Sequence, residues 1–178
     1  KSMNENVEKP NFEKFYQIKK KWPHHRIESH IMSKKPLQYI DQFSNHSDVI
    51  YFHHEIDDRI DEVSSLINNN KVKSGLVLHA SKKYNDLEKL IKPYQEVLIL
   101  CIEKPGESGQ EFLDTSYELI EKINNLKIRE KFNLCIDGGL SLKNISKIEC
   151  EKIVSASNVF KNTNPKKQIN NLQNILNN

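Results

Sequence analysis

The chain has 178 residues, of which 37% are hydrophobic, and this suits one globular domain with a single core. Its 27 basic and 24 acidic residues leave a formal charge of +3, which argues against a nucleic-acid-binding face. Cys101, Cys135 and Cys150 are widely spaced, which argues against a disulfide framework or a zinc knuckle. No apolar run approaches the roughly 20 residues of a membrane span, so we expect a cytoplasmic protein that binds neither nucleic acid nor membrane.

Apolar runs of strand length alternate along the chain with amphipathic stretches of helix length, the pattern of an α/β fold. A first helix is expected over residues 11–22, between two prolines. Strands are expected at 26–32, 48–53, 73–79, 96–101, 132–137 and 152–155. Helices are expected at 36–43, 57–68, 84–91, 111–126, 141–148 and 165–176. The continuously apolar run 97–100 is typical of a parallel strand covered on both faces.

In parallel α/β proteins the reactive residues gather after the carboxyl ends of the strands. His30 lies near the end of the first expected strand, and Asp137 ends the fifth, followed by Gly138 and Gly139. Two glycines allow bare backbone to approach a ligand. The alternatives are an ordinary buried polar residue for His30 and a simple turn for the Asp-Gly-Gly sequence.

Two further segments after strands are rich in small residues. The loop 103–110 leads into the start of the expected helix 111–126, where free N–H groups and the helix dipole can hold a phosphate. Residues 154–158 follow the last strand, where barrels commonly bind phosphate. Taken singly, each segment could equally be a connecting turn.

Together, in this order and at these separations, the four pieces resemble the ribulose-phosphate 3-epimerase family from about Pro10 to the end of the chain. Residues 28–33 (ESHIMS) resemble its third-strand signature, and the ending Phe52-His53-x-Glu55 is similar to that of its fourth strand. Residues 105–112 (PGESGQEF) resemble its proline-glycine loop, and Asp137-Gly138-Gly139 matches unchanged. Residues 156–160 (ASNVF) are similar to its final phosphate-binding segment.

The resemblance implies a (β/α)8 TIM barrel of the ribulose-phosphate-binding type. Because six strand–helix units are fewer than eight, we expect residues 1–178 to be a single barrel domain that is N-terminally incomplete, its first one or two strands lying upstream. The implied activity is the metal-assisted interconversion of D-ribulose 5-phosphate and D-xylulose 5-phosphate, by proton transfer at C3 between two acids. A homo-oligomer in the cytoplasm is also consistent with the resemblance.

Site residues follow from the same resemblance, position by position. His30 and Asp137 would be ligands of a divalent metal (Zn, Fe, Mn or Co), and Asp137 would also be catalytic. The residues implied to surround the substrate and its phosphate are Gly106, Ser108, Gly109, Gly138, Gly139, Ala156 and Ser157.

The chain also departs from the family pattern. Aligning Met3 with the family's methionine places Lys1 where the second catalytic aspartate is expected, and Glu107 adds negative charge to the loop. A catalytically inactive barrel that binds a sugar phosphate is therefore the alternative, and a decarboxylase-like relative ranks third. Because adjacent strand residues point to opposite faces, at most one of His53 and His54 is expected to face the site.

Overall fold

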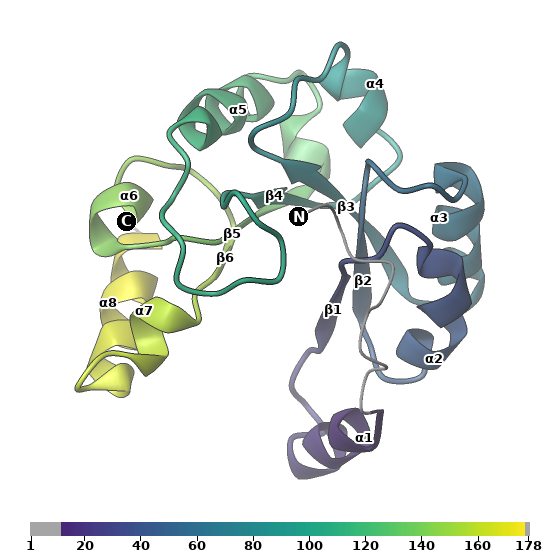
Figure 1. Cartoon of the computed structure of the whole chain (residues 1–178), viewed down its shortest axis with the longest axis horizontal. Coiled ribbons are helices and arrows are strands. Elements are labelled where there is room, and N and C mark those ends of the chain that lie inside the picture. The colour runs from purple at the N-terminus through teal and green to yellow at the C-terminus, as the bar shows by residue number, and fades with distance from the viewer. Residues whose placement is uncertain (1–11, 177–178) are drawn as a thin grey trace. The chain divides into compact units, whose positions relative to one another are not determined.

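The structure is a computed structural model that describes residues 12–176 (Figure 1). The described residues fold as two compact units that divide between Val77 and Leu78. Among the described residues there are six strands, and each of the four strand pairs with a determined register is parallel. None of the helices within 12–176 is long and apolar enough to cross a membrane.

The first unit is built around parallel strands. Its elements are α1 (Phe12–Lys21), β1 (Glu28–Ile31), a 3-10 turn (Pro36–Tyr39), α2 (Ile40–Ser44), β2 (Val49–His53), α3 (Ile60–Asn69) and most of β3 (Lys73–His79). All five residues of β2 are buried, as expected for a central strand. Helices α2 and α3 lie side by side on one flank of these strands (Figure 1).

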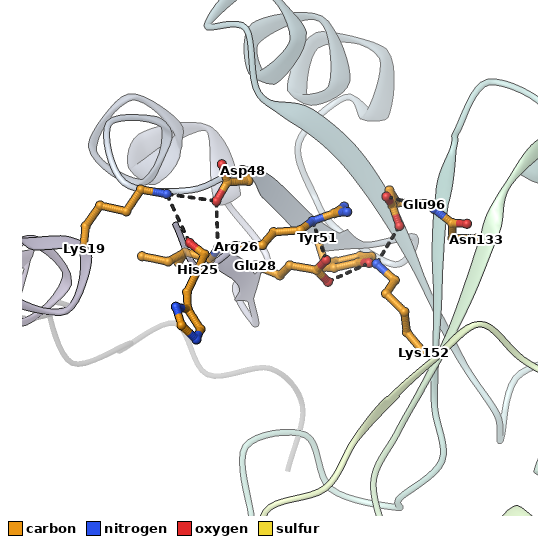
Figure 2. A network of polar contacts seen from close by, with 10 residues as sticks. Lys19, His25, Arg26, Glu28, Asp48, Tyr51, Glu96, Asn133 and Lys152 are labelled. Carbon is orange, nitrogen blue, oxygen red and sulfur yellow. Dashed lines mark hydrogen bonds and ion pairs between the residues drawn. The ribbon is translucent and has the colours of Figure 1, made fainter. Parts of the chain in front are cut away.

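Asp48 joins the start of this sheet to the first helix. Its carboxylate accepts a hydrogen bond from the backbone N–H of Ile27 at 2.7 Å and from Nζ of Lys19, in α1, at 3.3 Å (Figure 2). The backbone hydrogen bond, followed by the lysine, lowers the pKa of Asp48. The entry into β1 is therefore fixed by a charged side chain that precedes β2.

The second unit continues the alternation of strand and helix. Its elements are α4 (Leu87–Ile91), β4 (Glu96–Leu100), α5 (Thr115–Asn124), a 3-10 turn (Arg129–Lys131), β5 (Asn133–Asp137), α6 (Leu142–Ile145), β6 (Lys152–Val154), α7 (Ser157–Phe160) and α8 (Pro165–Leu176). In the parallel register Leu100 pairs with Asp137, which pairs with Val154. The carboxyl ends of β4, β5 and β6 are therefore level at one edge of the sheet.

The predicted order of strands and helices is confirmed, and several boundaries differ. The helix expected from residue 111 begins at Thr115, because residues 101–114 form a closed loop, and the helix expected from residue 84 begins at Leu87. Helix α7 was not predicted. The parallel α/β class is confirmed, whereas the closed eight-stranded barrel, its upstream strands and the single domain stay predictions.

Candidate active site

Asp137 is the last residue of β5, and the turn after it packs directly against the loop that follows β4. Gly138 and Gly139 have positive φ values of 101° and 65°, a conformation that side chains rarely adopt. A Cβ at Gly138 would lie 2.6 Å from Cγ2 of Ile102, and one at Gly139 would lie 2.4 Å from the backbone nitrogen of Phe112. The two glycines are therefore required by both conformation and space.

Backbone hydrogen bonds fix the loop between β4 and α5 against the tip of β5. The N–H of Cys101 donates to the carbonyl oxygen of Asp137 at 2.8 Å, and the N–H of Leu113 donates to that of Cys101 at 2.9 Å. The two ends of the loop thus meet beside Asp137, whose side chain is half-buried.

The side chain of Gln110 closes this loop from within. Its Oε1 accepts from the N–H of Lys104 at 2.9 Å, and its Nε2 donates to the carbonyl oxygens of Lys104 and Glu107, each at 2.7 Å. Gly106 and Gly109 turn the chain at φ values of 83° and 81°. Gln110 therefore braces an exposed rim that contains three of the predicted substrate-binding residues, Gly106, Ser108 and Gly109.

The segment after β6 lies near this rim through Lys161, a residue that the sequence reasoning missed. Ala156 is the N-cap of the short helix α7, and Ser157 is its first residue. Lys161 follows α7, and its Nζ lies 3.3 Å from the position that a Cβ on Gly109 would take. A basic residue one turn beyond a suspected phosphate segment is the signal that could have identified it.

Cys101 lies under the site without being part of its surface. Its side chain is fully buried, and burial raises the pKa of the thiol to about 12. The negative charge of Asp137 adds to this rise. The carboxylate of Asp137 is thus close enough for its charge to act on the thiol of Cys101.

His30 lies in the first unit, in β1, where it contacts a second imidazole. Its Nε2 is 2.8 Å from Nε2 of His53, the last residue of β2, and the centroids of the two rings are 4.9 Å apart, so the rings meet at their edges. His53 is fully buried, and its Nδ1 lies 3.3 Å from Oε1 of Glu55. The sequence reasoning noted His53 and Glu55 in the strand ending but gave them no role.

The predicted site residues fall into two groups. The second unit brings Asp137, Gly138 and Gly139 against the loop with Gly106 and Gly109, while His30 belongs to the first unit. Imidazole and carboxylate are donor types that a divalent metal accepts. Residues 12–176 contain no group of three His, Cys, Asp or Glu that could hold a metal. A metal-binding role of His30 and Asp137 therefore stays a prediction.

Comparisons with known proteins show the family to which the chain belongs. The chain matches the ribulose-phosphate 3 epimerase family over residues 12–160. It is 31% identical over 137 residues to the ribulose-phosphate 3-epimerase of Buchnera aphidicola subsp. Schizaphis graminum, covering 75% of this chain and 58% of that protein. The enzyme of the same name from Escherichia coli K12 is 25% identical over 156 residues, covering 84% of this chain and 69% of that protein.

Solved structures share the fold at much lower identity. The 3-hexulose-6-phosphate synthase of Salmonella typhimurium aligns with a TM-score of 0.67 at 13% identity, covering 93% of this chain and 79% of that one. KGPDC from Streptococcus mutans aligns with a TM-score of 0.61 at 12% identity. The chain spans 58% and 64% of the lengths of two Buchnera relatives that it matches. It belongs to the ribulose-phosphate 3-epimerase family.

Proposed function

We propose that this chain carries part of the active site of a ribulose-phosphate 3-epimerase, which interconverts D-ribulose 5-phosphate and D-xylulose 5-phosphate. The observation that carries the proposal is the carboxylate of Asp137 at the tip of β5, beside a glycine-lined turn packed on an exposed loop. Such a carboxylate at the carboxyl end of a parallel strand occupies the place where barrel enzymes hold their acid–base groups.

Asp137 would move the proton at C3 of the substrate. The C3–H bond is adjacent to the ketone, so removal of the proton leaves an enediolate, and return of a proton to the opposite face inverts C3. Inversion needs a second acid on the other face, and Asp137 serves one face only. The family pattern places the second acid at the aligned position of Lys1, which lies outside the described residues.

A divalent metal, when bound, would stabilise the negative charge that develops on the substrate oxygens. His30 and Asp137 are the described residues that would hold it, as an imidazole and a carboxylate ligand. By holding the metal, these two residues would orient C3 and the neighbouring substrate oxygens for proton transfer to the Asp137 carboxylate.

The phosphate would bind at the opposite end of the substrate, along the main chain of the two glycine turns. The residues assigned to this task are Gly106, Ser108, Gly109, Gly138, Gly139, Ala156 and Ser157. Lys161 would supply positive charge near the phosphate. This charge would offset the negative charge of Glu107 in the loop after β4. Sugar phosphates are thus the substrate class that this charge and backbone favour.

The direct test is exchange of the C3 hydrogen of ribulose 5-phosphate with solvent deuterium, catalysed by the intact protein. Asp137→Asn removes the base, so we expect the exchange rate to fall about 10²- to 10⁴-fold. Asp114→Asn changes an exposed aspartate that makes no side-chain capping bond to α5, and it should leave the rate unchanged.

A different outcome would favour the inactive barrel. If ribulose 5-phosphate raises the melting temperature of the intact protein while no C3 exchange occurs, the protein binds the sugar phosphate without turnover. Equal exchange by the wild type and the Asp137 variant would show that another residue is the base.

A further inference from the structure

The contact between His30 and His53 follows from the register of two neighbouring strands. His30 in β1 pairs with Tyr51 in β2, and His53 lies two residues beyond Tyr51, on the same face of the sheet. The planes of the two rings are inclined by 21°, which keeps each Nε2 close to the plane of the other ring. His54, the next residue, falls on the other side of this alternation.

Proton placement in this pair is constrained by chemistry. Two Nε2 atoms at 2.8 Å form a hydrogen bond only if one carries a proton and the other offers a lone pair. An ionised carboxylate accepts and cannot donate, so Glu55 at 3.3 Å requires the proton of His53 to be on Nδ1. Neutral His53 then has a bare Nε2, which accepts from the Nε2–H of His30.

We propose that Glu55 and His53 form a relay that fixes His30 as the tautomer with its proton on Nε2 and its lone pair on Nδ1. The inference rests on the proposed function, in which His30 is a metal ligand, and it assigns Nδ1 as the nitrogen that faces the metal. His53 and Glu55 are positioning residues, since they act through His30. Hydrogen-bonded partners of this kind set the tautomer and ring orientation of ligating histidines in general.

The buried position of His53 strengthens the assignment. Its side chain is fully buried while that of Glu55 is 30% exposed, so the relay runs from a partly solvated carboxylate to an enclosed imidazole. A buried neutral imidazole has one donor and one acceptor nitrogen, and both are matched here. The carboxylate thus decides the proton positions of two rings in series.

The tautomer can be measured directly by long-range nitrogen–proton correlation NMR on the intact, metal-free protein with ¹⁵N-labelled histidine, at about pH 8, which is above the ordinary pKa of free imidazole. In the wild type we expect His30 to carry its proton on Nε2. His53→Leu removes the acceptor, and Glu55→Gln removes the requirement for a proton on Nδ1 of His53. Both variants should give His30 as a mixture of the two tautomers.

His53→Gln tests whether the acceptor itself matters, because its side-chain oxygen can reach the place of Nε2 and should restore the Nε2–H form. His24→Leu, at an exposed histidine, is the matched control and should leave the His30 signals unchanged. Because Glu55 is partly exposed, Glu55→Gln provides a second variant if His53→Leu does not fold. A His30 proton on Nδ1 in the wild type, or a tautomer unaffected by Glu55→Gln, would overturn the relay.

Metal affinity gives a second readout that is separate from turnover. Titration of the intact protein with Co²⁺ should show about 10- to 100-fold weaker binding for His53→Leu, with recovery in His53→Gln. Equal affinity in all three proteins would contradict the positioning role. The tautomer measurement requires neither metal nor substrate, so failure of the epimerase assay alone would count against the proposed function and leave the relay standing.

Discussion

Cys101 shows how a nucleophilic side chain beside a candidate active site is kept out of its chemistry. The thiolate is the reactive form, and burial raises the pKa of this thiol from 9.0 to about 12. The negative charge of Asp137 opposes ionisation further. The thiol is therefore neutral at pH values near 7.

Labelling with a disulfide-exchange reagent at pH 8 tests this. In the native protein we expect Cys101 to react far more slowly than Cys150, which is only partly buried and whose pKa burial raises to about 11. Because folding raises the pKa of Cys101, its contribution to stability is complete below about pH 9 and is lost as the pH rises toward 12. Site-resolved mass spectrometry gives the rates, and denaturant should make both thiols react alike. Rapid native labelling of Cys101 would contradict its burial.

His53 marks the limit of sequence reasoning at the scale of single residues. Alternation along a strand predicts that one of two adjacent histidines faces the site, but it does not say which. That choice depends on the register between β1 and β2, which is set by packing between segments far apart in the chain. The position of Asp137 at a strand end could be predicted, because a strand followed by two glycines is a local signal.

The loop after β4 and the end of helix α7 lie close to each other. The loop is braced by Gln110, and Lys161, just past α7, reaches the backbone at Gly109. The Gln110 brace joins residues of one loop, whereas about 50 residues separate Gly109 from Lys161. Helix α7 is only four residues long, too short to show a helical pattern in the sequence. Sequence patterns identified both segments as rich in small residues, whereas their proximity required the fold.

Lys161→Met should weaken phosphate binding while the fold is retained. The lysine is exposed, so we expect about fivefold weaker binding of ribulose 5-phosphate, or ~1 kcal/mol, and a smaller dependence of affinity on salt. Calorimetry at two salt concentrations measures both. Lys166→Met removes the same charge at an exposed position in α8 and serves as the control. Equal losses in the two variants would indicate a general effect of net charge.

At the scale of the molecule, continuous apolar runs were sufficient to predict parallel strands with intervening helices. Such runs need cover on both faces, and crossover helices provide it. The closure of a barrel is different, because it depends on how the strands at the two edges of a sheet meet. That information is carried by no single segment, and closure stays a prediction.

The amino ends of the second unit's strands carry a polar network, at the opposite end of β4 from the loop that follows it. Glu96, the first residue of β4, is fully buried, and its carboxylate binds Nζ of Lys152 in β6 at 2.7 Å. The side-chain amide of Asn133 donates to the other oxygen at 3.3 Å (Figure 2). In (β/α) barrels, residues at the amino ends of the strands usually contribute to stability, and residues at the carboxyl ends usually carry the activity.

Lys152→Met should therefore destabilise the protein without changing the C3 exchange rate of the molecules that remain folded. Removal of one partner leaves Glu96 as a buried charge, at a cost of about 3 kcal/mol in the free energy of unfolding measured with urea. Combining it with Glu96→Leu should recover most of this loss, because an apolar pair of similar volume needs no compensation. Lys122→Met breaks an exposed ion pair with Glu118 and should cause no resolvable change. If Lys152→Met is as stable as this control, the pair does not stabilise the strands.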